Sequence, residues 1–300
     1  MRCNLLILSL VLLATPAFAQ DSDLCVDRPG LGTPACTAGR GQAVIEMGLV
    51  GWDHIADGST VEDDLTYGDL LLRVGLDDRT EVQMGIGGYT SARSRDRLSG
   101  AVTRSHGIGD AVIGLRRSLT GPGGPIAVQG YVTLPTGQRG IGAGDWGAGV
   151  LVPMGYKLPA GFELDLTPEL DAAVNASGSG RHLRSGGVVG LAHSLGTAVT
   201  LSGEVGAWRD DDPSGHATDV RGAVSLAWQP GRDWQLDLEG DLGLTAAAPP
   251  PFAARGSGSA VLILAAMRRR GSGACPWQSA ASLSAAFQTP APRSDARAHG

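Results

Sequence analysis

The chain has 300 residues, of which 46 are glycine, and its formal net charge is −6. Lys157 is the only lysine, so arginine supplies nearly all of the positive charge. A chain without a basic footprint is not expected to bind nucleic acid. A transmembrane helix needs about 18 or more apolar residues in a row, and after the N-terminus the sequence has no such stretch.

Residues 1–19 have the pattern of a secretory signal peptide. Arg2 precedes an apolar core at 5–13, and Ala17-Phe18-Ala19 has the small-x-small form of a cleavage site. We therefore expect a mature chain that begins at Gln20, outside the cytoplasm.

Residues 20–41 are predicted to be a periplasmic N-terminal segment. The segment is rich in turn-forming residues and contains Cys25 and Cys36. Two cysteines this close together in an oxidising compartment favour a disulfide. We expect it to close a small loop ahead of the first strand.

From Gln42 onward, apolar and polar residues alternate, which predicts strands with one apolar and one polar face. The predicted strands span 42–52, 65–76, 80–89, 108–119, 126–135, 147–158, 162–174, 185–195, 198–208, 217–228 and 234–244, with a weaker twelfth at 259–268.

The connections between these strands alternate in length. Tight turns such as 77–79 and 159–161 are separated by long polar segments such as 90–107 and 136–146. A soluble β-sandwich has no reason to sort its loops in this way, whereas outer-membrane barrels have short periplasmic turns and long extracellular loops. We therefore predict an all-β fold: one antiparallel outer-membrane β-barrel of about 12 strands over residues 42–268.

Aromatic residues at the strand ends support a barrel in a membrane. They lie on the apolar face beside the short turns, where an interfacial girdle is expected. Hairpin aromatics that cover a soluble core are the alternative. The residues are Tyr156, Phe162, Trp228 and Trp234.

The strand at 162–174 indicates which face of the wall lies inside. Its acidic residues share one face, opposite a face of leucine and phenylalanine. A charged side chain in lipid is costly, at roughly 2–4 kcal/mol for a base at the bilayer midplane and somewhat less for an acid, so the acids should face the lumen. Applied to every strand, this rule predicts a lumen in which acids outnumber bases. The predicted lumen-lining and cation-path residues are Asp69, Arg73, Glu81, Asp110, Arg116, Glu163, Asp165, Glu169, Asp171 and Glu204.

Five aromatic residues have the same strand parity as the inward acids. They are Trp52, Tyr67, Tyr89, Tyr131 and Trp208. We expect these side chains to stack a flat solute. Girdle residues with a locally shifted register are the alternative.

Two features depart from a regular wall. Pro153 and Pro168 lie inside predicted strands, where each removes a ladder hydrogen bond, so we expect a bulge or local opening there. Residues 269–300 lack periodicity and are predicted to be a disordered tail. A native tail and a frameshift product are both open explanations for that segment.

The sequence contains short matches to motifs of enzymes and metal proteins, but each match is incomplete. Residues 142–147 match GxGxxG but belong to no βαβ unit. Residues 210–215 begin like a calcium loop, yet Arg221 stands where the closing glutamate is required. Neither a metal-ligand spacing nor a nucleophile motif is found. We therefore predict no cofactor, no metal and no catalytic residue.

Seven short motifs resemble the family of outer-membrane transporter-like proteins named for the meta-pathway of phenol degradation. The resemblance implies a bacterial outer-membrane barrel that takes up small, often aromatic, compounds, and it transfers no catalytic residue. The motifs are DRPGLGTPAC at 27–36, GDAVIGLRRSL at 109–119, VTLPTG at 132–137, GAGDWGAGVLVPMGY at 142–156, LTPELDAAV at 166–174, RDDDPSGH at 209–216 and SLAWQPG at 225–231.

We therefore predict a monomeric outer-membrane channel for passive uptake of small solutes through an acidic lumen. The expected partners are outer-membrane lipid, a small-molecule solute and the barrel-assembly machinery. Two alternatives remain open: a barrel that is plugged and serves a structural or surface role, and a barrel enzyme that acts on lipid.

Overall fold

The computed structural model describes residues 24–56, 59–245 and 259–262. This part of the chain is almost entirely β-structure, and the one short 3-10 helix is η2 (Pro159–Gly161). None of its helices is long and apolar enough to cross a membrane. The strands are β1 (Ala43–Ala56), β2 (Thr60–Tyr67), β3 (Asp69–Gly75), β4 (Thr80–Ile86), β5 (Tyr89–Asp96), β6 (Val102–Ile108), β7 (Ala111–Ser118), β8 (Ala127–Leu134), β9 (Gly147–Leu151), β10 (Met154–Lys157), β11 (Phe162–Val174), β12 (Arg181–Ser194), β13 (Val199–Asp212), β14 (Gly215–Trp228), β15 (Leu236–Gly243) and β16 (Ser259–Leu262).

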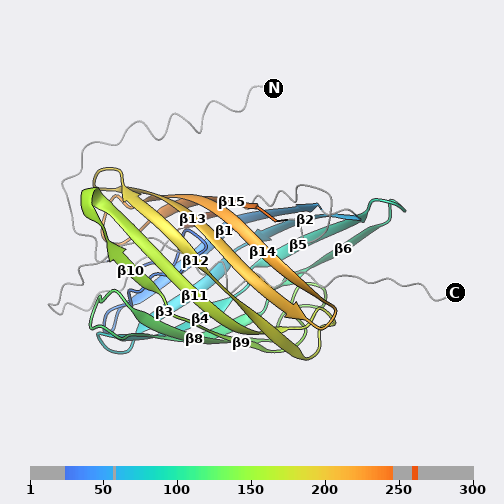
Figure 1. Cartoon of the computed structure of the whole chain (residues 1–300), viewed down its shortest axis with the longest axis horizontal. Coiled ribbons are helices and arrows are strands. Elements are labelled where there is room, and N and C mark those ends of the chain that lie inside the picture. Colours follow the sequence, from blue (N-terminus) through green and yellow to red (C-terminus); the bar gives the residue numbers. More distant parts are fainter. Residues whose placement is uncertain (1–23, 57–58, 246–258, 263–300) are drawn as a thin grey trace, which may run out of the picture.

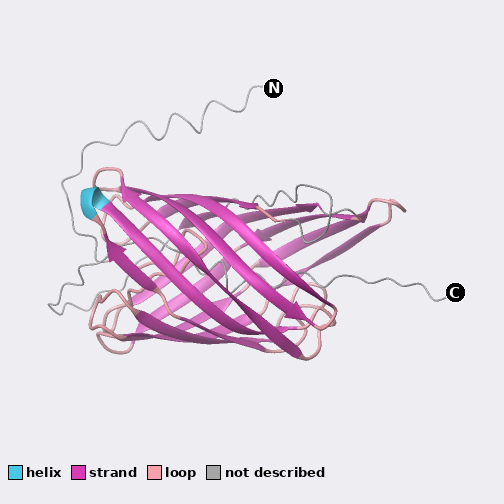
Figure 2. Cartoon of the chain, viewed as in Figure 1, coloured by secondary structure: helices cyan, strands magenta, loops and turns pink. Residues whose placement is uncertain are grey.

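All strand pairs are antiparallel and form one curved sheet (Figures 1 and 2). From β7 to β16 the sheet follows the order of the chain, whereas β4 pairs with β7, β3 with β1, and β2 lies between β1 and β5. The last described strand, β16, pairs with β15 on one side and with β1 on the other, so four residues link the two ends of the sheet. The predicted antiparallel β-barrel is therefore confirmed. The predicted signal peptide, residues 263–268 and the predicted tail lie outside the described residues.

A band of glycines divides the first four long strands along their length, into a part within the barrel wall and an outer part beyond it. β2 continues into β3 through Gly68, β4 into β5 through Gly87 and Gly88, and β6 into β7 through Gly109. A Cβ on Gly88 would lie 2.3 Å from the Tyr67 carbonyl oxygen, so only glycine fits this close approach. We call the outer part, residues 51–56 of β1 together with β2, β5 and β6, the extension. It projects beyond the rest of the barrel (Figure 1).

The wall opens locally at the two prolines, as the sequence predicted. One long strand is divided into β9 and β10 at Val152 and Pro153. The amide of Val152 still donates to the Pro168 carbonyl at 3.0 Å, and the Pro153 carbonyl accepts from Ala127 at 2.9 Å. β11 passes through Pro168 without a break and keeps its pairing with β12.

The outward face is apolar and the inward face is polar, the reverse of a soluble protein. Large apolar side chains such as Leu170 and Val224 are 52% and 61% exposed, while the most deeply buried large side chains include Arg73 and Arg116, both at 0%. Trp228 and Trp234 meet edge to face beside a short turn, with ring centroids 5.3 Å apart. This pattern is that of a wall with lipid outside.

Candidate functional site: a plug inside the barrel

The predicted periplasmic position of the N-terminal segment is wrong for its described part. Residues 24–41, which we call the plug, lie inside the barrel, and nearly every residue from Leu24 to Ala38 is buried. The plug leaves the lumen at the short-turn end, where Arg40 forms a parallel bridge with Gly75. The physical reason for its inward position is a set of charges on the wall that match those of the plug.

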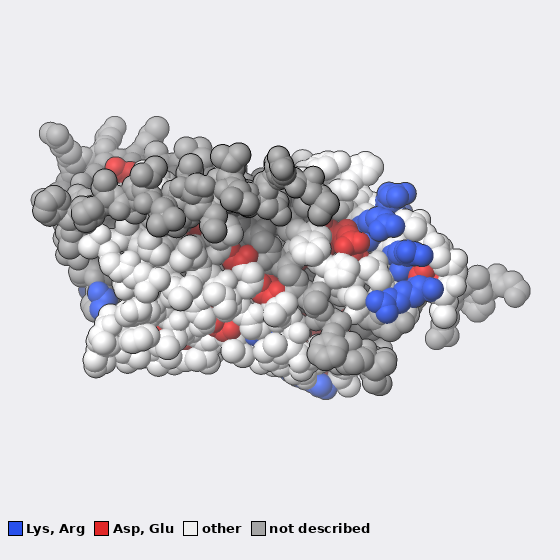
Figure 3. Space-filling view, turned by 90° about the horizontal axis from the view of Figure 1, so that it is seen from above, with Lys and Arg blue, Asp and Glu red and all other residues white. Residues whose placement is uncertain are grey.

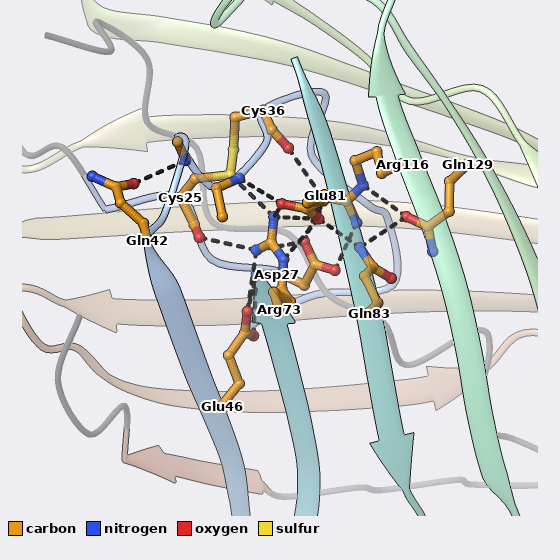
Figure 4. The surroundings of a disulfide bond; sticks show 12 residues. Cys25, Asp27, Cys36, Gln42, Glu46, Arg73, Glu81, Gln83, Arg116 and Gln129 are labelled. Atoms are coloured by element: carbon orange, nitrogen blue, oxygen red, sulfur yellow. Dashed lines mark hydrogen bonds and ion pairs between the residues drawn. A yellow bond between two sulfur atoms is a disulfide. The ribbon is translucent and has the colours of Figure 1, made fainter. Parts of the chain in front are cut away.

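A disulfide joins Cys25 to Cys36 and folds the plug into a compact loop (Figure 4). The Asp27 carboxylate lies within this loop. The backbone N–H of Asp27 donates to both carboxylate oxygens of Glu46, at 3.0 and 3.1 Å. The Asp27 side chain is fully buried. A buried carboxylate needs a charged partner, and two arginines of the wall provide it.

Arg116 on β7 binds Asp27 in a bidentate manner, with its two Nη atoms 2.8 and 2.6 Å from the two carboxylate oxygens. Arg73 on β3 approaches the same carboxylate at 3.0 Å. Each arginine also donates to a half-cystine carbonyl, Arg73 to Cys25 at 2.9 Å and Arg116 to Cys36 at 3.1 Å. The two arginines therefore hold both ends of the disulfide loop.

The surrounding wall completes this ion-pair network (Figure 4). Glu81 on β4 accepts two hydrogen bonds of 2.9 Å from Arg73 and one from the Ala38 amide of the plug. Gln83 donates to Glu81 at 2.7 Å, and Gln129 on β8 accepts from Arg116 Nε at 2.7 Å. We call Asp27, Glu46, Arg73, Glu81 and Arg116 the charge cluster. Three acids and two bases thus lie together away from solvent.

The opposite wall holds the plug through its backbone. Gly30 N–H donates to Glu239 on β15 at 2.9 Å, and Leu31 N–H donates to Glu204 on β13. Thr33 N–H donates to the Thr167 hydroxyl on β11 at 3.1 Å. Gly30 has a φ of 120°, a backbone conformation that favours glycine. Because these strands lie across the barrel from β3, β4 and β7, the plug spans the lumen.

An apolar contact covers the tip of the plug. Leu31 packs with Val188, Ala223 and Trp208, whose side chain is 2% exposed. Trp208 Nε1 donates to Glu169 at 3.1 Å, and the same carboxylate accepts from the Tyr131 hydroxyl at 3.2 Å. Two of the five predicted aromatic contacts, Tyr131 and Trp208, are therefore brought together on a shared carboxylate.

The other three predicted aromatic residues do not join them. Trp52, Tyr67 and Tyr89 lie at the extension and are 47%, 43% and 47% exposed. At the glycine band the alternation of inward and outward side chains is reversed. Residues beyond the band that share the odd or even numbering of the inward acids therefore face outward. The alternative of a locally shifted register therefore describes these three positions.

Two predicted lumen residues position the outer parts of the chain. Asp69 accepts from the Gly88 amide in the glycine band and faces Arg28 of the plug at 3.7 Å. Asp110 accepts from the amides of Gly137 and Ala143, both at 2.7 Å, and so folds the loop between β8 and β9. Both carboxylates are therefore engaged in contacts within the protein, which the sequence did not indicate.

The loop motif around Trp146 has a structural role. Hydrogen bonds from the amides of Trp146 and Gly180, together with the Arg181 guanidinium, hold the pKa of Asp145 below its ordinary value. The Arg181 guanidinium lies 3.6 Å from the centroid of the Trp146 ring. These contacts join two neighbouring loops at one end of the barrel.

We predict that replacing both Cys25 and Cys36 by serine loosens the plug while the barrel wall stays folded. Opening a loop of this length restores conformational freedom worth about 3 kcal/mol to the released segment. Hydrogen exchange of the full chain in detergent measures this: amides 24–41 should exchange roughly 100-fold faster, and amides of β11 to β14 should be unchanged. Equal protection of the plug in the variant would show that the disulfide contributes nothing to docking.

Comparison with known proteins places these features in context. A family model described as "Putative MetA-pathway of phenol degradation" matches residues 26–256. An outer-membrane channel from Pseudomonas putida F1 is similar in structure, with a TM-score of 0.59 at 14% identity over 79% of this chain and 99% of that one. No curated protein sequence matches the chain.

Two further structures are similar over about three quarters of this chain. The translocator domain of the autotransporter NalP from Neisseria meningitidis gives a TM-score of 0.47 at 14% identity, over 76% of this chain and 89% of that one. The CymD monoaromatic hydrocarbon channel gives 0.43 at 9% identity, over 76% and 89%.

Proposed function

This chain belongs to that phenol-degradation family, whose model matches most of its length, and we propose that it is an outer-membrane channel for passive uptake of small solutes. In this proposal the plug occupies the lumen and must move for solutes to pass. We propose further that it works as a monomer inserted by the barrel-assembly machinery and carries out no catalysis.

One observation carries the proposal: the inward charges of the wall bind a separate segment of chain. Some wall side chains pair with one another, as Arg73 does with Glu81, but others bind the plug. Glu204 and Glu239 accept hydrogen bonds from plug amides, and Arg116 binds Asp27. Deep in the lumen the plug is held by wall side chains, so its removal breaks no strand pairing of the barrel.

The solute class follows from what the plug covers. Withdrawal of Leu31 would uncover Trp208, Val188 and Ala223. An apolar surface with an aromatic ring beside polar groups suits a small aromatic solute, which agrees with the description of the family. The Tyr131 hydroxyl and the Glu169 carboxylate lie next to this surface and could bind a polar substituent.

The second candidate is a permanently closed barrel with a structural role. The 0% exposure of Arg73 and Arg116 favours it, because fully buried ion pairs are costly to separate. The two candidates differ in one respect that can be measured, namely whether the lumen conducts once the plug is absent.

We predict that a channel freed of its plug prefers cations. Acidic rings attract cations and repel anions. By parity in the sequence, thirteen inward acids outnumber four inward bases; the acids are Glu46, Asp69, Glu81, Asp110, Glu163, Asp165, Glu169, Asp171, Glu204, Asp219, Asp237, Glu239 and Asp241, and the bases are Arg73, Arg116, Lys157 and Arg221. In a potassium chloride gradient, a variant that lacks residues 24–38 should give a reversal potential of cation-selective sign. Neutralising Glu163, Asp165, Glu169 and Asp171 should reduce it.

The control for this measurement neutralises Asp78 and Asp233, which are exposed at short turns, and should leave the reversal potential nearly unchanged. Anion preference of the plug-free channel, or no effect of the four inward neutralisations, would contradict an acidic conduction path.

A further inference from the structure

The two faces of the extension carry opposite charge. On one face, Thr66 and Thr90 join their hydroxyls at 2.8 Å, and Ser105 donates to the Gly140 carbonyl of the loop held by Asp110. Because Asp110 has inward parity on β7, this is the lumenal face. It also carries Asp53, Glu62 and Asp64, and burial together with the first two carboxylates raises the pKa of Asp64 to about 6.

The outward face of the extension is basic. Arg93 and Arg95 on β5 and Arg104 on β6 share it, since Arg93 pairs with Arg104 and Arg95 with Val102. Figure 3 shows a group of basic side chains at the end of the molecule that the extension occupies in Figure 1, and since Lys157 is the only lysine and lies on β10, these are arginines. The chain as a whole has a net charge of −6, so this concentration of arginine is local.

Arg93 and Arg104 lie directly opposite each other on neighbouring strands. Like charges in this position destabilise a sheet. Asp63 offsets the pair only in part: it lies 3.7 Å from Arg93 and is also bound to His54 at 2.6 Å. Within the described ranges Arg95 and Arg104 have no ion pair, so the basic face lacks a matching number of acids.

The basic face continues the lipid-facing surface of the barrel. Tyr67, Tyr89 and Ile108 form one row across β2, β5 and β6, and each is more than 40% exposed. Aromatic rows of this kind lie at the membrane interface. Arg93 is four residues beyond Tyr89, or about 13 Å further along the strand. The arginines therefore lie on the outer side of the interface, facing the headgroups of the outer leaflet.

We propose that the outward face of the extension binds the phosphates of a phosphorylated glycolipid in the outer leaflet. The guanidinium group forms bidentate hydrogen bonds to phosphate, and a phosphate between Arg93 and Arg104 would relieve their repulsion. The aromatic row would contact the sugar and acyl parts below. This site is independent of the lumen and of solute passage.

The test uses the full chain in a zwitterionic detergent and native mass spectrometry, with bis-phosphorylated lipid A as the probe. The wild type should retain lipid A, and the affinity of the double variant Arg93→Gln/Arg104→Gln for lipid A should be at least about tenfold lower. Arg79→Gln/Arg117→Gln removes the same charge at the opposite end and should bind like the wild type. If the first double variant does not fold, the single variant Arg95→Gln tests the same face and should show a smaller loss of lipid A binding.

Phosphate-free lipid A is the ligand control and should not be retained by the wild type. Equal losses in the two double variants, or retention of the phosphate-free lipid, would overturn the site. Full competition by millimolar inorganic phosphate would also overturn it, because free phosphate and not a lipid would then be the ligand.

Discussion

Replacing Asp27 by alanine is expected to release the plug from the charge cluster. The change removes a carboxylate that binds Arg116 at 2.6 and 2.8 Å and Arg73 at 3.0 Å, all with fully buried side chains. Removing one partner of a buried ion pair costs about 3–5 kcal/mol, because the other charge is left uncompensated. Hydrogen exchange of amides 24–41 should therefore accelerate roughly 100- to 5,000-fold.

A double-mutant cycle separates the ion pair from general damage to the plug. Arg116→Met removes the other partner, and the double variant Asp27→Ala/Arg116→Met leaves no unpaired charge between them. We expect the double variant to exchange more slowly than the product of the two single effects predicts. Independent effects that simply multiply would show that the pair is not coupled.

Thr37→Val provides a matched control in the same segment. The Thr37 hydroxyl is buried and has no hydrogen-bond partner among the described residues, so its loss should leave exchange unchanged or slow it slightly. If Asp27→Ala accelerates exchange by less than tenfold, the charge cluster does not hold the plug.

Strand positions were predictable because each strand of the wall has lipid on one side. The alternation at 162–174 gives the bounds of β11, and the short turns give the positions of β12 to β14. The same rule fails beyond Gly68, Gly88 and Gly109, where the chain leaves the wall and the alternation inverts. For that reason, alternation alone predicts the wrong face for Trp52, Tyr67 and Tyr89. The glycines themselves are the signal that could have shown it.

The position of the plug was not predictable from local pattern. Its motif at 27–36 has no period, and its partners Arg73 and Arg116 lie far away along the chain. One signal was present: two arginines and two glutamines, Gln83 and Gln129, have inward parity near the same level of the wall. Such a polar group suggests a partner inside, but only the folded chain identifies it as Asp27.

Deleting residues 24–38 is expected to open the lumen. The deletion removes every plug contact to the charge cluster, to Glu204 and Glu239, and to Trp208, and it leaves the strand pairing of β1 to β16 intact. Wall charges that lose a partner become hydrated, since water replaces the plug around them. The variant should therefore insert and remain folded, which heat-modifiable gel migration in detergent can confirm before any transport measurement.

The central claim, that this barrel is a plugged channel, is tested most directly by conductance in planar bilayers. The intact chain should give little or no current, and the variant without residues 24–38 should give stable, reproducible channels, with phenol entering proteoliposomes faster than glycerol. The Thr37→Val protein should behave like the intact chain. A folded, inserted variant that still conducts no ions would contradict the account and identify the barrel as a closed structural protein.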